Sequence, residues 1–273
     1  MKKKSIWVST KIFNRLNSLN LKQYYFECAL IFLNVILRSS ILYASETYYN
    51  LKENELRTLE RIEEQFLRKL LKTGRGCPVS QLYLETGHVP ARFAVTKLRC
   101  LFLKSILDES TESLIYRFIM AQYENPTRGD WVSSCLRDLK YLNISLTLED
   151  IKAMKKSLFK RILKESIRNK ALQYLLDKRG SKGMQIQYSS LKMAEYLLPN
   201  TERLSISAQR YIFAIRNRMV QIENNFPNKM SKKLCFCGNT EDQEHLYSCK
   251  FLNEKNEMIE YKRIFEENVE KTY

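Results

Sequence analysis

Apolar residues recur every three or four positions along much of the chain. In residues 53–72 this spacing places five apolar side chains on one face of a helix. They are Leu56, Leu59, Ile62, Phe66 and Leu70. Acidic residues near the start and basic residues near the end of this stretch complement the helix dipole, and Gly74 provides a stop signal. The pattern predicts a helix over residues 53–72.

Similar patterns predict helices over residues 80–86, 91–107, 148–176 and 207–223. The apolar run at residues 24–37 contains Glu27 and Asn34 and is short for a bilayer span, so we expect a buried helix there. Only seven glycines and five prolines occur in 273 residues, which favours long helices over many short strands. We therefore expect a mainly α fold.

The stretch ENPTRGD at residues 124–130 collects turn-forming residues and is the best candidate for a boundary. We expect three units: helices in residues 1–125, a basic helical segment in residues 126–230, and a terminal module in residues 231–273. The chain carries 46 Lys and Arg against 30 Asp and Glu. Residues 151–233 hold most of this excess, with 19 basic and 5 acidic side chains. Such a balance favours a polyanionic partner.

Five basic residues follow one another at strict four-residue spacing in the predicted helix 148–176. They are Lys152, Lys156, Lys160, Lys164 and Arg168. On a helix this spacing gives a slowly winding stripe that a phosphate backbone can follow. The alternative is a solvated helix face. Because Glu165 is the one counter-charge nearby, we favour contact with nucleic acid.

The predicted helix 207–223 carries Arg210, Arg216 and Arg218. Arginines beside Tyr211 and Phe213 suit phosphate clamping and base stacking, although core packing is the more common fate of such rings. We include the three arginines among the candidate nucleic-acid contacts.

A possible metal site lies in residues 235–249, CFCGNTEDQEHLYSC. Zinc favours four thiolate or imidazole ligands in a tetrahedron, and this stretch offers Cys235, Cys237, His245 and Cys249. Thr240 and Gln243 resemble a capping box, and the helix that it begins would place His245 and Cys249 on one face. The alternatives are a chance cluster or disulfides. Because all four positions would be filled by protein, we expect structural Zn2+ rather than a catalytic metal.

Other features bound the class of protein. Seven cysteines and no recognisable signal peptide favour a reducing, intracellular compartment. The second histidine, His88, lies between Gly87 and Pro90, and we expect a surface position for it in a loop. The aspartates are dispersed, without the adjacent pair that holds polymerase metal ions, and no set of acid, base and nucleophile is recognisable. We therefore expect no enzymatic activity of the chain itself.

Three stretches together resemble the C-terminal region of non-LTR (LINE-like) retrotransposon reverse transcriptases. They are residues 41–71, similar to the segment and helix after the palm; residues 76–107, similar to the linker after the thumb; and the arginine-bearing helix leading into the CCHC knuckle at residues 204–249. Tyr49 stands where the family often has Trp, and Ala44 where it often has Gly. The resemblance implies a helical thumb and linker bundle with a small C-terminal zinc knuckle.

From this resemblance and the charge pattern, we expect a nucleic-acid-binding portion of a reverse transcriptase that lacks the polymerase active site. It would grip template RNA, RNA–DNA hybrid or target DNA, inside the cell and in the nucleus, as one part of a longer reverse transcriptase polypeptide. We expect no membrane partner. The alternative is a zinc-stabilised helical module that binds a protein partner through its apolar helix faces.

Overall fold

The computed structural model describes residues 2–19, 21–48, 51–127, 129–178, 188–199 and 204–217, together with residues 245 and 249. All regular structure in these ranges is helical, which confirms the predicted mainly α fold. The longer helices are α1 (Lys2–Ser18), α4 (Glu53–Leu71), α6 (Ala91–Leu107), α7 (Leu114–Glu124), α8 (Trp131–Tyr141), α10 (Lys156–Asp177) and α11 (Ile206–Arg216). The shorter helices are α2 (Tyr25–Phe32), α3 (Ser39–Ile41), α5 (Val79–Thr86) and α9 (Leu148–Ala153). A π-helical segment, η2 (Leu33–Arg38), joins α2 to α3, and three 3-10 turns are η1 (Lys22–Tyr24), η3 (Ser45–Thr47) and η4 (Glu195–Leu197).

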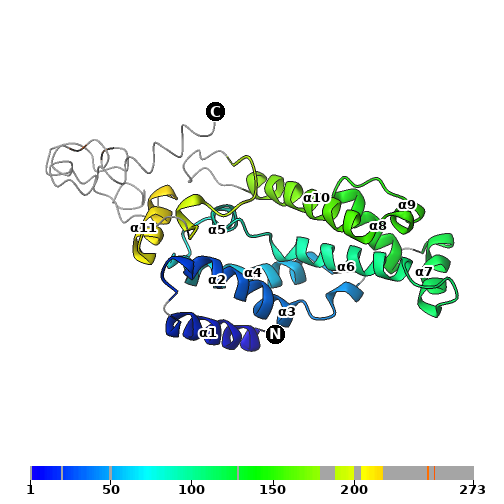
Figure 1. Cartoon of the computed structure of the whole chain (residues 1–273), viewed down its shortest axis with the longest axis horizontal. Helices are drawn as coiled ribbons and strands as arrows, with labels where there is room; N and C mark the ends of the chain where they lie inside the picture. The colour runs from blue at the N-terminus through cyan, green and yellow to red at the C-terminus, as the bar shows by residue number, and fades with distance from the viewer. Residues whose placement is uncertain are drawn as a thin grey trace.

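Helix α6 is the centre of the arrangement. It packs against α4, α8, α9 and α10 and against the turn η3, while α1 lies outside α2 and contacts α4. Figure 1 shows α7 at one end of the elongated bundle and α11 at the other. The two candidate nucleic-acid segments, α10 and α11, therefore occupy different parts of the molecule.

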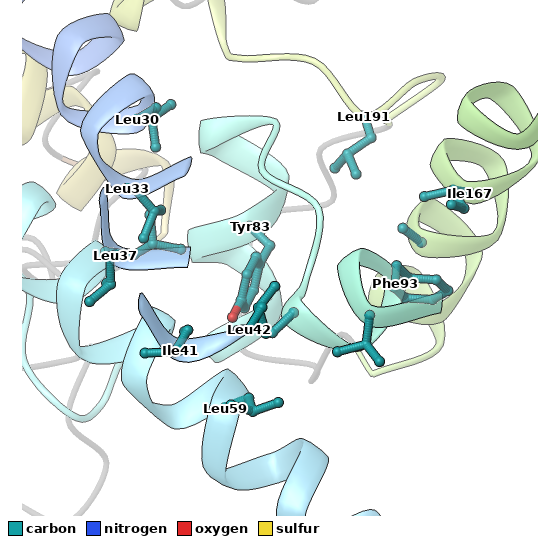
Figure 2. Packing of buried hydrophobic residues seen from close by; sticks show 14 of the residues in the cluster. Leu30, Leu33, Leu37, Ile41, Leu42, Leu59, Tyr83, Phe93, Ile167 and Leu191 are labelled. Carbon is teal, nitrogen blue, oxygen red and sulfur yellow. The ribbon is translucent and has the colours of Figure 1, made fainter. Parts of the chain in front are cut away.

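One continuous hydrophobic cluster runs through the described helices, from Val8 to Phe213. Figure 2 shows part of it, where Leu37 from η2, Tyr83 from α5 and Phe93 from α6 lie within the same core. Buried residues before and after the expected boundary at 125/126 belong to this cluster, for example Leu103 and Leu163. The units 1–125 and 126–230 thus share a core wherever the structure describes them.

The predicted helices at 53–72, 80–86 and 91–107 are confirmed by α4, α5 and α6. One detail differs at the end of α4. The left-handed residue that ends the helix is Lys72, with φ of 50°, and not Gly74. Arg68 holds the chain that follows the helix, since its guanidinium donates to the carbonyl groups of Gly74 and Cys77.

The single helix predicted over residues 148–176 is wrong. Met154 and Lys155 adopt extended ψ angles of 138° and 135°, which separate α9 from α10. Lys104 Nζ donates to the carbonyl of Lys152 at 3.1 Å and so supplies a donor at the C-terminal end of α9. This ammonium is buried and also pairs with Asp108 at 2.6 Å, so the break is fixed by a tertiary contact from α6.

The apolar run at residues 24–37 forms a helix that is buried on one side alone. Ile31, Val35 and Ile36 remain 48%, 64% and 43% exposed, whereas Leu33 and Leu37 are fully buried. Among the described residues, the helical run 22–41 is the one stretch long and apolar enough to cross a bilayer, and core helices also meet that test. The expectation of a buried helix therefore holds for its inner face only.

Candidate nucleic-acid interface

Lys160, Lys164 and Arg168 lie on one flank of α10. Their side chains are exposed, while Phe159, Leu163 and Ile167, one position before each of them, are buried against the core. This offset arises because residues four apart keep nearly the same direction on a helix, so the basic stripe follows the buried stripe along the helix. The structure thus brings three of the predicted basic residues together.

The excess of basic residues in α10 does not stabilise the helix itself. Its 22 residues include six basic and two acidic side chains. No acidic residue lies in its first turn and no basic residue in its last turn, the reverse of what the helix dipole favours. Among the described residues, none of Lys160, Lys164 and Arg168 pairs with a carboxylate.

Lys97 on α6 joins this flank of α10. Its pKa is lowered from the usual range, first by partial burial and then by the positive charges of Lys160, Lys164, Arg38 and Arg168. We name the set Lys97, Lys160, Lys164 and Arg168 the α6–α10 basic surface. Sequence reasoning did not find Lys97, because its approach to α10 depends on how two helices pack.

The break between α9 and α10 separates Lys152 from the α6–α10 basic surface, whereas Lys156 is the first residue of α10. Lys152 Nζ lies 2.8 Å from Tyr116 Oη on α7 and 4.5 Å from the centre of the same ring. Lys156 Nζ donates to Ser105 Oγ at 3.1 Å. The prediction of one continuous five-residue stripe is therefore wrong: Lys152 lies on α9, and the four residues from Lys156 to Arg168 lie on α10, with Lys156 also contacting α6.

The two described arginines of α11 make internal contacts. Arg210 Nε donates to the carbonyl of Leu70 at 2.9 Å, and its guanidinium lies 5.3 Å from the ring centre of Tyr25. Arg216 Nε lies 3.0 Å from Glu85 Oε1, with 13% of its side chain exposed. Arg218 lies outside the described residues. Arg210 and Arg216 thus tie α11 to the bundle and do not join the α6–α10 basic surface.

Glu85 is a buried carboxylate that no sequence pattern singles out. It accepts hydrogen bonds from Tyr188 Oη at 2.7 Å and Tyr196 Oη at 3.0 Å, besides the contact with Arg216. Burial, together with the charge of Glu85, raises the pKa of Tyr196 well above its usual value. Two segments distant in sequence, residues 188–199 and α11, therefore meet on one carboxylate of α5.

His88 is buried, and the predicted surface position is wrong. Its Nε2 lies 3.9 Å from Glu63 Oε1, beyond hydrogen-bonding distance, and its ring stacks on Tyr83. Burial and the charge of Arg38 lower the pKa of His88 to about 4. Burial alone would raise the pKa of Glu63, but Arg38, whose Nε lies 2.6 Å away, and His88 lower it to about 2. The prediction from sequence placed His88 in a loop, and no sequence pattern indicated that a buried carboxylate of α4 would lie beside it.

Two of the four predicted zinc ligands lie in the described residues. His245 and Cys249 are 9% and 1% exposed, and the amide of Cys249 donates to the carbonyl of His245 at 2.8 Å. This hydrogen bond spans the four-residue separation that the zinc prediction places on one helix face. Cys235 and Cys237 lie outside the described residues. Comparisons with family models, curated proteins and solved structures find no match to this chain.

Proposed function

We propose that this chain binds nucleic acid electrostatically through the α6–α10 basic surface. The observation that carries the proposal is the exposed row of Lys160, Lys164 and Arg168 on α10, without carboxylate partners among the described residues; Lys97 lies near it, and burial first and then these positive charges lower the pKa of Lys97. Like charges held together without carboxylate partners destabilise a fold, so a polyanion is the natural counter-charge. We infer no enzymatic step for these residues.

The mechanism is neutralisation of phosphates. Helix α10 has 22 residues and is therefore about 33 Å long, close to one turn of a nucleic-acid duplex. Lysines and arginines that contact phosphates release condensed counterions and carry little information about base sequence. Binding should accordingly tolerate many sequences and weaken steeply with salt.

The test is a triple variant, Lys160→Gln, Lys164→Gln and Arg168→Gln. All three side chains are exposed, so the fold should persist while three phosphate contacts are lost. We expect affinity for a mixed-sequence duplex at low salt to fall about tenfold or more, measured by fluorescence anisotropy.

The matched control neutralises three exposed lysines elsewhere, with Lys22→Gln, Lys52→Gln and Lys140→Gln. It removes the same net charge from the molecule. If both triple variants lose affinity equally, net charge rather than the α6–α10 basic surface governs binding and the proposal fails.

We further propose that the chain is a C-terminal portion of a retrotransposon reverse transcriptase that carries a structural zinc knuckle. The support is the order of the three resembling stretches and the hydrogen bond from the amide of Cys249 to the carbonyl of His245. We expect about one zinc ion per chain by elemental analysis, with loss in Cys237→Ser and retention in Cys28→Ser. Zinc-free purified protein that remains folded would contradict this assignment.

A protein-binding module is a second candidate, favoured by an apolar patch on α7. Leu114, Ile115 and Phe118 are 84%, 42% and 59% exposed there. Exposed apolar patches mark protein interaction sites. Under this view Phe118→Asp abolishes partner binding, while the Lys160, Lys164 and Arg168 triple variant leaves it intact.

A further inference from the structure

A cavity of about 350 Å³ lies where the N-terminal half of α4 meets α6 and α8. Its wall combines two kinds of side chain. Arg99 and Arg137 contribute guanidinium groups, and Leu56, Phe93 and Tyr141 contribute apolar and aromatic surface. Cavities of this size with few polar groups on an apolar wall are typical of small-molecule sites.

Arg99 is the unusual member of this wall. It is 5% exposed, and its Nη1 lies 3.0 Å from Asp138 Oδ2. Its Nε and Nη2 atoms have no hydrogen-bond acceptor among the described residues, and Asp138 Oδ2 receives no hydrogen bond there either. A buried guanidinium normally has acceptors for its N–H groups. Arg99 therefore retains donors that a bound anion can use after small side-chain adjustments.

The charges around the cavity favour an anion. Arg92, which also lines it, is already satisfied by Glu60 and Glu53. Asp138 is the carboxylate opposite Arg99, and burial raises its pKa, while the charges of Arg99 and Arg137 lower it. Arg137 is exposed and forms no ion pair with a described residue. Two guanidiniums thus face the cavity against one carboxylate.

The aromatic part of the wall favours a flat group. Tyr141 is 47% exposed, whereas Phe93, whose ring lies 6.3 Å away with its plane 21° from parallel, is 1% exposed. The exposed part of the Tyr141 ring is therefore the surface on which a planar heterocycle can stack. A ligand that combines a planar ring system with a negative charge would use both halves of the cavity.

We propose that this cavity binds a nucleotide, with its phosphate at Arg99 and Arg137 and its base against Tyr141. The nucleotide is either a free mononucleotide or an unpaired residue of a bound strand, because both present the same chemistry. The cavity uses none of the α6–α10 basic surface, so it can bind even if that surface does not.

The test follows binding of AMP, inorganic phosphate and adenosine to the full chain by NMR chemical-shift titration. We expect saturable binding of AMP that is about tenfold tighter than that of phosphate or adenosine, since each of these lacks one half of the ligand. Arg137→Gln should weaken AMP binding about tenfold without disturbing the fold, because this side chain is exposed. Arg117→Gln, an exposed arginine on α7, is the matched control and should change nothing.

Arg99→Lys tests the buried donor directly, and Arg137→Gln decides the question if the Arg99 variant does not fold. Equal affinities for AMP and phosphate, or AMP binding that is unchanged in Arg137→Gln, would overturn the proposal. A competition arm separates the two sources. If a single-stranded oligonucleotide displaces AMP and a blunt duplex does not, the occupant includes an unpaired residue of a strand; if neither displaces it, the occupant is a free nucleotide.

Discussion

Charged side chains in the interior hold distant segments together. Arg38 from η2 meets Glu63 from α4, and Arg216 from α11 meets Glu85 from α5. Removing one partner of such a buried ion pair typically lowers the free energy of unfolding by about 3–5 kcal/mol, since the remaining charge is left without compensation. A sequence shows the charge of each residue but not which charges will be buried together. For this reason Glu63 and Glu85 could not be recognised beforehand.

The buried His88 predicts a specific pH dependence of stability. Its pKa is lowered to about 4 in the folded chain, against 6.5 for an ordinary histidine. Between these values the unfolded chain binds a proton that the folded chain does not, so stability must fall as pH falls from 6.5 toward 4. We expect His88 to contribute a loss of about 2 kcal/mol in the free energy of unfolding between pH 6.5 and pH 5. Urea unfolding at several pH values measures it.

His88→Gln provides the comparison for this prediction. The variant keeps a polar side chain but cannot titrate, so its unfolding free energy should change much less between pH 6.5 and pH 5. The carboxyl of Glu63, with its pKa lowered to about 2, contributes mainly below pH 4.5 and so is separated from this window. Identical slopes for the two proteins would show that His88 is accessible to protons in the folded state.

At the scale of elements, the local sequence pattern was sufficient to predict a helix and its ends where amphipathic spacing and end signals agreed. Helix α6 begins and ends as the sequence predicts, and α4 and α5 nearly so. The break between α9 and α10 was not predictable, because its apolar spacing continues across Met154. At the end of α9, the ammonium of Lys104, 48 residues earlier in the chain, donates to the carbonyl of Lys152. The local pattern predicts a continuous helix here, and a tertiary contact accompanies the break.

The link between α5 and the segment 188–199 depends on a glycine. Gly87 ends α5 with φ of 62°, and a Cβ atom there would lie 2.2 Å from the backbone nitrogen of Met193. Gly87→Ala therefore adds both left-handed strain and a backbone clash, and we expect a loss of about 3 kcal/mol or more in the free energy of unfolding. Chemical denaturation monitored by circular dichroism measures this loss.

Gly74→Ala is the matched control for that experiment. No heavy atom lies within 4 Å of a Cβ built at Gly74, so the change should fall within about 0.5 kcal/mol of the parent chain. If Gly87→Ala proved equally mild, the segment 188–199 would not pack closely against α5 in solution.

At the scale of the whole molecule, one shared core carries an uneven distribution of charge. The sequence predicted the basic residues of α10, because their four-residue spacing needs only a helix. It could not predict Lys97, nor that Arg210 and Arg216 would turn inward to Leu70 and Glu85, since those outcomes depend on helix packing. The candidate interface is therefore smaller than the sequence suggested and lies on α6 and α10 alone.

This smaller interface fixes the salt dependence of binding. For duplex DNA, the logarithm of the association constant falls with the logarithm of salt concentration by about 0.9 for each phosphate neutralised. If Lys160, Lys164 and Arg168 each contact one phosphate, replacing all three by glutamine should reduce the magnitude of the slope by about 2.7. The Lys22, Lys52 and Lys140 triple variant should keep the parent slope, because it removes equal charge away from the interface. Anisotropy titrations across a range of salt concentrations measure both slopes, and a parent slope near zero would exclude phosphate neutralisation as the source of binding.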